Sequence, residues 1–259
     1  MCTVSILRHK SGMTVTSNRD ELRTRNEAGV KQELAGSTQR IYPVDAQAQG
    51  TWVGVNDYGI AASLLNMYES EYQGSLSRGL IIPRLLEFQS LDDARDWLTQ
   101  SLQPYLYSAF VLLVMDRNDL YRYRWDGNSL TEELIEFSHY FLETSSSVDL
   151  VKTVAHRQRI FKEWHDAEGH CEAVLTFHCK RDETSSTNSI CMAREHSHTK
   201  SVSQIQIDDN TVYFRYLSPD CLEQFVNTQI DATQLEVVEY ELLDSLQSNT
   251  AVLPKVCAG

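Results

Sequence analysis

Position 2 of the chain holds a cysteine, which can supply both a nucleophile and a base when it becomes the first residue. Removal of an initiator methionine is favoured when the next residue is small, as Cys2 is. The processed residue would carry a thiol and an α-amine, whose ordinary pKa of about 7.7–8.0 suits a base at neutral pH. The amine can take the proton of its own thiol. Cys2 is therefore the first candidate for catalysis.

The first twenty residues predict a β-hairpin that brings two charged side chains to Cys2. Apolar residues alternate with polar ones on both sides of a turn-like tetrapeptide at residues 9–12. With those four residues in the loop, paired positions sum to 21, so Cys2 faces Arg19 and Asp20 lies one position further along. An arginine opposite the cysteine favours the thiolate, and an aspartate beside the amine would orient it. A shift of one residue in register would undo this arrangement.

The residues alone leave a second interpretation open. A cysteine at position 2 occurs in many proteins without a catalytic role, and charges at the end of a strand are commonly solvated. The combination of Cys2 with a paired Arg19 and an adjacent Asp20 favours catalysis more than any one of these residues does. The elements around them must therefore be predicted before a function is assigned.

Strands and helices follow the first hairpin in turn. Two further hairpins are predicted, with strands at 51–55, 60–66, 108–115 and 120–125. Helical segments are predicted at 77–88 and after Ser90, which begins a capping pattern. A long helix is predicted from Ser147 to about Trp164, because its apolar residues recur at helical spacing.

Two segments lack either periodicity and are predicted to be irregular, at 22–49 and 165–188. Three more strands are expected near the end of the chain, at 189–192, 201–207 and 211–217. Strands at both ends with helices inserted between them predict an α+β fold or layered sandwich, in a single domain over residues 1–259.

Composition and charge exclude several classes of protein. The 259 residues include 23 Lys and Arg against 36 Asp and Glu, a net charge of −13. A chain this acidic repels phosphate as a whole, so no nucleic acid partner is expected. The longest apolar run, residues 109–115, is far shorter than the ~20 residues that span a bilayer, and no integral membrane segment is expected. Without a visible secretory signal, we expect a cytoplasmic protein whose six cysteines are thiols, ligands or a nucleophile rather than disulfides.

Three motifs in order resemble the NRDE family of transport and Golgi organisation 2-like proteins. They are Met1-Cys2, Asn18-Arg19-Asp20-Glu21 and the run GTWVGVN at 50–56, and Ser77-Arg78-Gly79 also resembles a family element. The resemblance implies the N-terminal-nucleophile hydrolase fold, a four-layer αββα sandwich. It also implies a distant likeness to choloylglycine hydrolases and penicillin V acylases, which cleave amides other than peptide bonds.

The resemblance also implies roles for four residues. Cys2 would be the nucleophile, and Arg19 and Asp20 the pair that flanks it. Asn66 resembles an oxyanion-hole asparagine of the acylases, a donor worth roughly 3–4 kcal/mol in other enzymes, although an asparagine here can equally make a turn. Where the family tends toward a Ser-Asn pair, this chain has only hydroxyl residues at 144–147. The implied activity is hydrolysis of a small non-peptide amide after removal of the first methionine, with no cofactor required.

Histidines and cysteines gather in the second half of the chain, at His165, His170, Cys171, His178 and Cys179. Their spacing is too loose for a zinc site, so we expect a polar surface segment and no metal. Family members have been linked to haem trafficking, and a non-covalent haem site needs only one axial His or Cys. The alternative to an amidohydrolase is therefore a non-catalytic haem-binding or haem-trafficking protein on the same scaffold. His156, which shares a helix with Arg157 and Arg159, is expected to face solvent.

Overall fold

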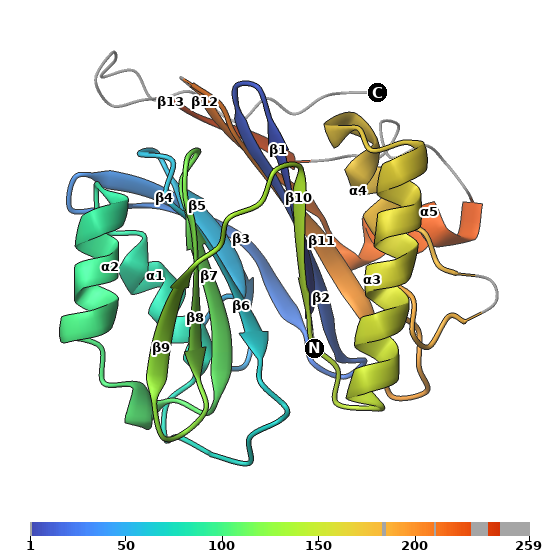
Figure 1. The fold of residues 1–259 in the computed structure, drawn as a ribbon, viewed down its shortest axis with the longest axis horizontal. Coiled ribbons are helices and arrows are strands. Elements are labelled where there is room, and N and C mark those ends of the chain that lie inside the picture. Colours follow the sequence, from blue (N-terminus) through green and yellow to red (C-terminus); the bar gives the residue numbers. More distant parts are fainter. Residues whose placement is uncertain (1, 183–184, 210, 229–237, 244–259) are drawn as a thin grey trace.

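A computed structural model describes residues 2–182, 185–209, 211–228 and 238–243 of the chain. Two antiparallel β-sheets stack face to face, and helices cover the outer face of each sheet (Figure 1). The structure therefore has four layers in the order helix, sheet, sheet, helix. This arrangement confirms the α+β sandwich that the sequence predicted.

The first sheet contains the hairpin that begins at Cys2. Its six strands are, in spatial order, β10 (Tyr140–Thr144), β1 (Cys2–His9), β2 (Gly12–Leu22), β11 (Ser197–Ile207), β12 (Thr211–Leu217) and β13 (Val238–Leu243). β1 and β2 are therefore inner strands, paired on both edges. Cys2 thus enters the sheet with a neighbouring strand on each side.

The second sheet is a meander in which each strand pairs with the next one along the chain. Its seven strands are β3 (Glu27–Ala35), β4 (Thr38–Asp45), β5 (Val53–Asn56), β6 (Ala61–Asn66), β7 (Phe110–Met115), β8 (Leu120–Trp125) and β9 (Leu130–Leu134). Four of these strands coincide closely with the two later hairpins that the sequence predicted. Short antiparallel connections explain why local sequence patterns found them.

The helices form the two outer layers (Figure 1). The outer face of the seven-stranded sheet is covered by α1 (Ile81–Leu85) and α2 (Leu91–Gln100), and the other sheet by α3 (Leu150–Ala167), α4 (Cys171–Cys179) and α5 (Pro219–Thr228). Short 3₁₀ turns lie at Arg78–Leu80 and Pro104–Leu106. Ser90 caps α2 by accepting a hydrogen bond from the backbone of Asp93, as predicted. No helix in the described ranges is long and apolar enough to cross a membrane.

The register of the first hairpin is the one that the sequence predicted. Cys2 pairs with Arg19, Val4 with Ser17 and Ile6 with Val15. Alternation along β1 turns Cys2, Val4 and Ile6 into the core between the two sheets. The apolar pattern sets this register, because a slip of one residue would exchange the buried and outer faces.

The prediction that residues 22–49 are irregular is wrong. β2 continues to Leu22, and β3 and β4 form a hairpin within this range. β3 lies at the edge of the sheet and carries mostly exposed or partly exposed residues, so it shows little hydrophobic alternation. Charged side chains are common on edge strands because they oppose pairing with other chains.

Three predictions in the second half of the chain also need correction. The segment 165–188 contains α4, whose apolar side chains pack between α3 and the sheet. Residues 189–192 are buried but do not form a strand. The long helix begins at Leu150 after Asp149, which has a left-handed φ of 43°, and Ser147 does not cap it. These features depend on contacts between distant segments, which local patterns do not report.

Two glycines allow the backbone at the start of the 50–56 motif to pack directly against the backbone of the Ser77-Arg78-Gly79 motif. A Cβ on Gly50 would lie 2.7 Å from the carbonyl carbon of Gly79, and a Cβ on Gly79 would lie 2.8 Å from the nitrogen of Thr51. The backbone nitrogen of Thr51 also donates to the carbonyl of Gly79 over 3.0 Å. This contact holds Arg78 at a defined place beside β5.

We therefore expect Gly79→Ala to destabilise the protein by about 1–3 kcal/mol, because the new methyl group must displace backbone atoms. Urea unfolding followed by circular dichroism measures the change. The control is Ser77→Ala, which replaces a side chain that makes no capping hydrogen bond and should change stability by less than about 0.5 kcal/mol. Equal stabilities for the two variants would contradict the packing argument.

Candidate active site

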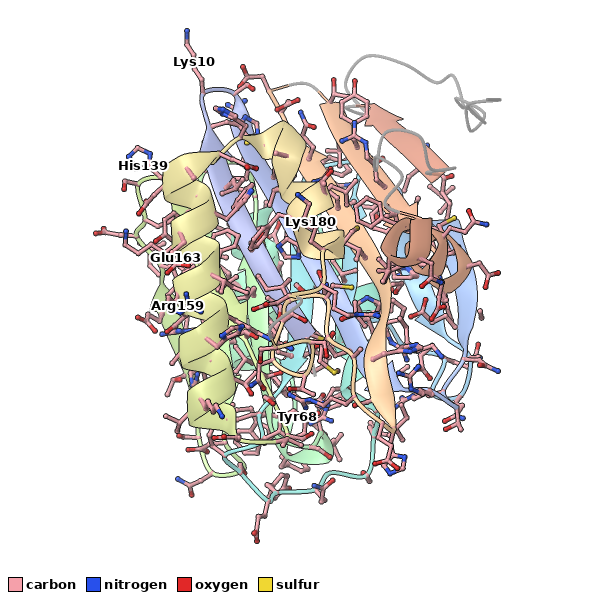
Figure 2. All side chains as sticks on the ribbon, turned by 90° about the vertical axis from the view of Figure 1, so that its right-hand side faces the viewer. Lys10, Tyr68, His139, Arg159, Glu163 and Lys180 are labelled. Carbon is pink, nitrogen blue, oxygen red and sulfur yellow. The ribbon has the colours of Figure 1, made fainter. Side chains whose placement is uncertain are left out.

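A cavity of about 110 Å³ opens beside the first residue of β1. Its walls include Cys2, Arg19, Asp20 and Asn66, so the structure brings together all four residues that the sequence singled out. The cavity lies away from the turn of the first hairpin. Figure 2 shows Tyr68, which neighbours Asn66, at the end of the molecule opposite Lys10 in that turn.

The thiol of Cys2 is buried, and its backbone is held by a residue far away in sequence. The nitrogen of Cys2 donates to Oγ of Ser145 over 3.3 Å, and the nitrogen of Ser145 donates to the Cys2 carbonyl over 3.0 Å. Burial raises the pKa of the Cys2 thiol, the nearby carboxylate of Asp20 raises it further, and Arg19 lowers it. The thiol therefore needs a base in order to ionise near neutral pH.

The guanidinium of Arg19 is held between two carboxylates of the other sheet. It donates to Glu27 over 2.9 Å and to Asp45, and it lies over the ring of Trp52 with its carbon 4.4 Å from the ring centre. Arg19 does lower the pKa of Cys2, as predicted, but burial outweighs it. Two carboxylate partners explain the weak effect, because they neutralise much of the field of the arginine.

The carboxylate of Asp20 is completely buried on the side of the sheet that faces α3. It accepts hydrogen bonds from Arg157 over 3.1 Å and from the hydroxyl of Thr199 over 2.5 Å. The pairing of β11 with β2 shifts between Thr199 and Ser201, opposite Asp20 and Arg19. Such a bulge redirects side chains, and here it accompanies the hydroxyl contact with Asp20.

Asn66 ends β6 and forms a small polar group with its neighbours. Its side-chain nitrogen donates to the hydroxyl of Tyr68 over 2.9 Å. Burial raises the pKa of Tyr68 to about 12, so this hydroxyl stays protonated near neutral pH. Arg78 lines the same cavity and donates to the carbonyl of Ala109 over 2.7 Å. The amide of Asn66 is therefore a hydrogen-bond donor at the wall of the cavity that holds Cys2.

Arg157 and Ser145 were not identified from the sequence, although the sequence contains an indication of each. Arg157 is fully buried and lies at four-residue spacing between Thr153 and Phe161, the other buried residues of α3. That spacing indicates an inward position, whereas Arg159 and Glu163 point into solvent (Figure 2). The segment 144–147, which does not match the Ser-Asn pair of the family, is the one that contacts Cys2.

His156 is only partly exposed and lies 3.1 Å from a carboxylate oxygen of Asp182, so the prediction that it faces solvent needs correction. The structure describes five cysteines, of which Cys2, Cys179 and Cys191 are buried and Cys171 and Cys221 are partly exposed. Within the described ranges, no group of three or more His, Cys, Asp and Glu is placed to hold a metal ion.

His178 of the histidine and cysteine cluster is a buried structural residue. The amide nitrogen of Asn18 donates to two carbonyls, so its oxygen accepts from Nδ1–H of His178 over 2.5 Å. Nε2 then accepts from the hydroxyl of Ser5 over 2.7 Å. With both ring nitrogens in use and Cys179 buried beside it, this pair does not fit the axial ligation of a haem.

Comparison with solved structures identifies the class of fold. A mutant and a variant of the conjugated bile acid hydrolase from Clostridium perfringens resemble this chain with TM-scores of 0.51 and 0.53, each at 10% identity. The matches cover 94% and 93% of this chain and 98% and 97% of the hydrolase chains. The N-acylethanolamine-hydrolyzing acid amidase orthologue of Caenorhabditis elegans gives a TM-score of 0.48 at 11% identity, over 79% of this chain and 92% of that one. The chain has the fold of the N-terminal-nucleophile hydrolases.

The family is shown by the sequence itself. The family model described as Transport and Golgi organisation 2 matches residues 1–243. The chain therefore belongs to the Transport and Golgi organisation 2 family, which confirms the resemblance carried by its N-terminal motifs. A search of curated proteins finds no match to this sequence.

The buried histidine makes stability depend on pH. Burial, with a further contribution from Arg157, lowers the pKa of His178 from 6.5 to about 3. The unfolded chain therefore binds a proton at this histidine at a higher pH than the folded chain does. Stability falls as the pH drops through about 6.5, and the slope approaches about 1.4 kcal/mol per unit at lower pH. The loss continues until the pH approaches 3. Urea unfolding at about pH 6.5 and pH 5.5 measures it.

The control is His178→Gln, which cannot titrate. Its absolute stability will differ, so only the dependence on pH is compared between the two proteins. Wild type should lose about 1 kcal/mol more than the variant over that unit of pH, because this histidine is already half protonated in the unfolded chain at about pH 6.5. The same pH dependence in both proteins would show that His178 does not titrate on unfolding.

Proposed function

We propose that the protein is an N-terminal cysteine amidohydrolase that acts on a small non-peptide amide after removal of Met1. The observation that supports it is the cavity in which Cys2 and the amide of Asn66 both form part of the wall. The fold supports the same conclusion, since the bile acid hydrolase of similar fold is by its name a hydrolase. No cofactor is needed for this chemistry.

The first step is formation of the thiolate. Because burial raises the pKa of the Cys2 thiol, the thiol requires a nearby base. The α-amine formed on removal of Met1 is the nitrogen that Ser145 holds through a hydrogen bond of 3.3 Å. That amine takes the thiol proton, and Ser145 acts as the residue that positions it. Asp20, which Arg157 holds on the face of the sheet toward α3, raises the pKa of the Cys2 thiol.

The thiolate then attacks the carbonyl carbon of the amide and forms a tetrahedral oxyanion. The side-chain N–H groups of Asn66 donate to that oxygen as its charge develops. The α-ammonium group returns a proton to the leaving amine, the C–N bond breaks, and a thioester with Cys2 remains. Water attacks the thioester with the α-amine as base, releasing the acid and restoring the thiol.

A haem-binding function on the same scaffold is the second candidate from the sequence. Haem needs an accessible axial ligand, and His178 and Cys179 of the histidine and cysteine cluster are both buried. We find no feature in the described residues that favours haem over a small amide. The proposal therefore contains no haem-dependent step.

The role of Cys2 as the nucleophile can be tested directly. We expect the intact mass of active protein to be short by one methionine, and Cys2→Ala to abolish hydrolysis of a panel of small N-acyl amides. Release of the free acid is followed by mass spectrometry. Cys221→Ala is the matched control, because it removes a partly exposed thiol on α5 and should leave the rate unchanged.

The folded state of Cys2→Ala is checked by its circular dichroism spectrum and its unfolding midpoint. Loss of turnover with an intact fold supports the mechanism. Full retention of Met1 in an active preparation would overturn it, because the α-amine would then not be available as the base. Turnover that survives Cys2→Ala would overturn the role of the thiol.

The role of Asn66 as the oxyanion donor can be tested by substitution. Asn66→Ala removes the donor to the oxyanion, so kcat should fall by about 10²–10³ with little change in KM. Asn128→Ala, in an exposed turn of the second sheet, is the control and should not change kcat. A kcat that stays within about twofold of wild type would indicate that Asn66 only shapes the turn after β6.

A further inference from the structure

The charged side chains around the cavity are paired with one another, with one exception. Arg19 pairs with Glu27 and Asp45, Arg25 with Glu21 and Asp45, and Asp20 with Arg157. Arg78 lines the same cavity and makes no ion pair with any carboxylate of the described residues. Within the described residues, Arg78 is therefore the one charged side chain of the cavity wall that has no opposite charge at ion-pair distance.

Arg78 is held in place and keeps unused donors. One of its terminal nitrogens donates to the carbonyl of Ala109 over 2.7 Å, and its backbone is fixed by the close contact between Gly79 and Thr51. A guanidinium has five N–H donors in a planar fork, which matches the two oxygens of a carboxylate. Burial lowers the pKa of Arg78, which shows the cost of leaving this charge without a partner.

We propose that Arg78 binds a carboxylate group of the substrate, so that the protein selects N-acyl compounds that carry an anionic group. The part of this inference that concerns substrate selection rests on the proposed hydrolase function. Binding of an anion at Arg78 does not depend on turnover. A carboxylate neutralises the partly buried guanidinium, and a neutral analogue leaves it unpaired. Arg78 is thus a specificity-determining residue on the wall that it shares with Cys2.

Alkylation of Cys2 by a matched pair of reagents tests this inference. The thiolate sulfur displaces iodide from iodoacetate or from iodoacetamide, which are similar in size and differ in charge. Rates at each cysteine are measured by peptide mass spectrometry. We expect iodoacetate to be favoured at Cys2 relative to Cys221, and Arg78→Gln to lower the ratio of iodoacetate to iodoacetamide rates at Cys2 about tenfold.

Arg117→Gln is the control, since it removes the same charge from an exposed side chain that pairs with Asp209. It should leave the ratio of rates at Cys2 unchanged. If Arg78→Gln slows both reagents equally, Arg78 is a counter-ion of the Cys2 thiolate and the inference is wrong. An unchanged ratio also overturns it.

A second measurement covers the case in which Cys2 reacts too slowly with both reagents. Calorimetric titration with N-acetylglycine, a small N-acyl carboxylate, should show binding that weakens about tenfold or more in Arg78→Gln. N-acetylglycinamide, its neutral counterpart, should bind both proteins equally weakly. Equal binding of the two compounds to wild type would overturn the inference. Neither measurement needs catalysis, so failure of the hydrolase proposal and failure of the anion site are distinguishable.

Discussion

Three consecutive residues of β2 hold the layers of this protein together around the candidate site. Side chains alternate along a strand, so Asn18 and Asp20 face the helical layer while Arg19 faces the other sheet. Asn18 holds His178 of α4, and Asp20 holds Arg157 of α3. Arg19 reaches across to Glu27 and Asp45 of the second sheet. The position of Cys2, which pairs with Arg19, depends on all three contacts.

The buried pair of Arg157 and Asp20 matters most among these contacts. Arg157 also donates to the hydroxyls of Thr3 and Thr144, so one guanidinium joins α3 to β1, β2 and β10. Taking a charge out of water is costly, and removing one partner of such a pair leaves the other uncompensated, at a cost of about 3–5 kcal/mol. The pair therefore fixes the orientation of α3 and the geometry at Cys2 together. Cys2 is also buried, which raises the pKa of its thiol. The thiol therefore needs a base, which a processed N-terminus would provide.

Much of the fold around the site could be predicted because its causes are local. The first hairpin has a clear alternation and a short turn, so its register and the pairing of Cys2 with Arg19 followed directly. The hairpin at β3 and β4 and the helix α4 could not be predicted in the same way. Edge strands carry charged residues that hide the alternation, and α4 has no side-chain cap and depends on packing against α3 and the sheet.

For the site, the sequence by itself determined which residues have the right chemistry, and which strand pair brings Cys2, Arg19 and Asp20 together. It identified Cys2, Arg19, Asp20 and Asn66, and all four line one cavity. Only the tertiary structure decided which partners pair with these residues and hold them in place. Arg157, Ser145 and Arg78 come from segments far along the chain, and whether a charge is paired, buried or left open depends on what the fold places beside it. Electrostatic neighbours are set by distance in space, and a linear sequence records only order along the chain.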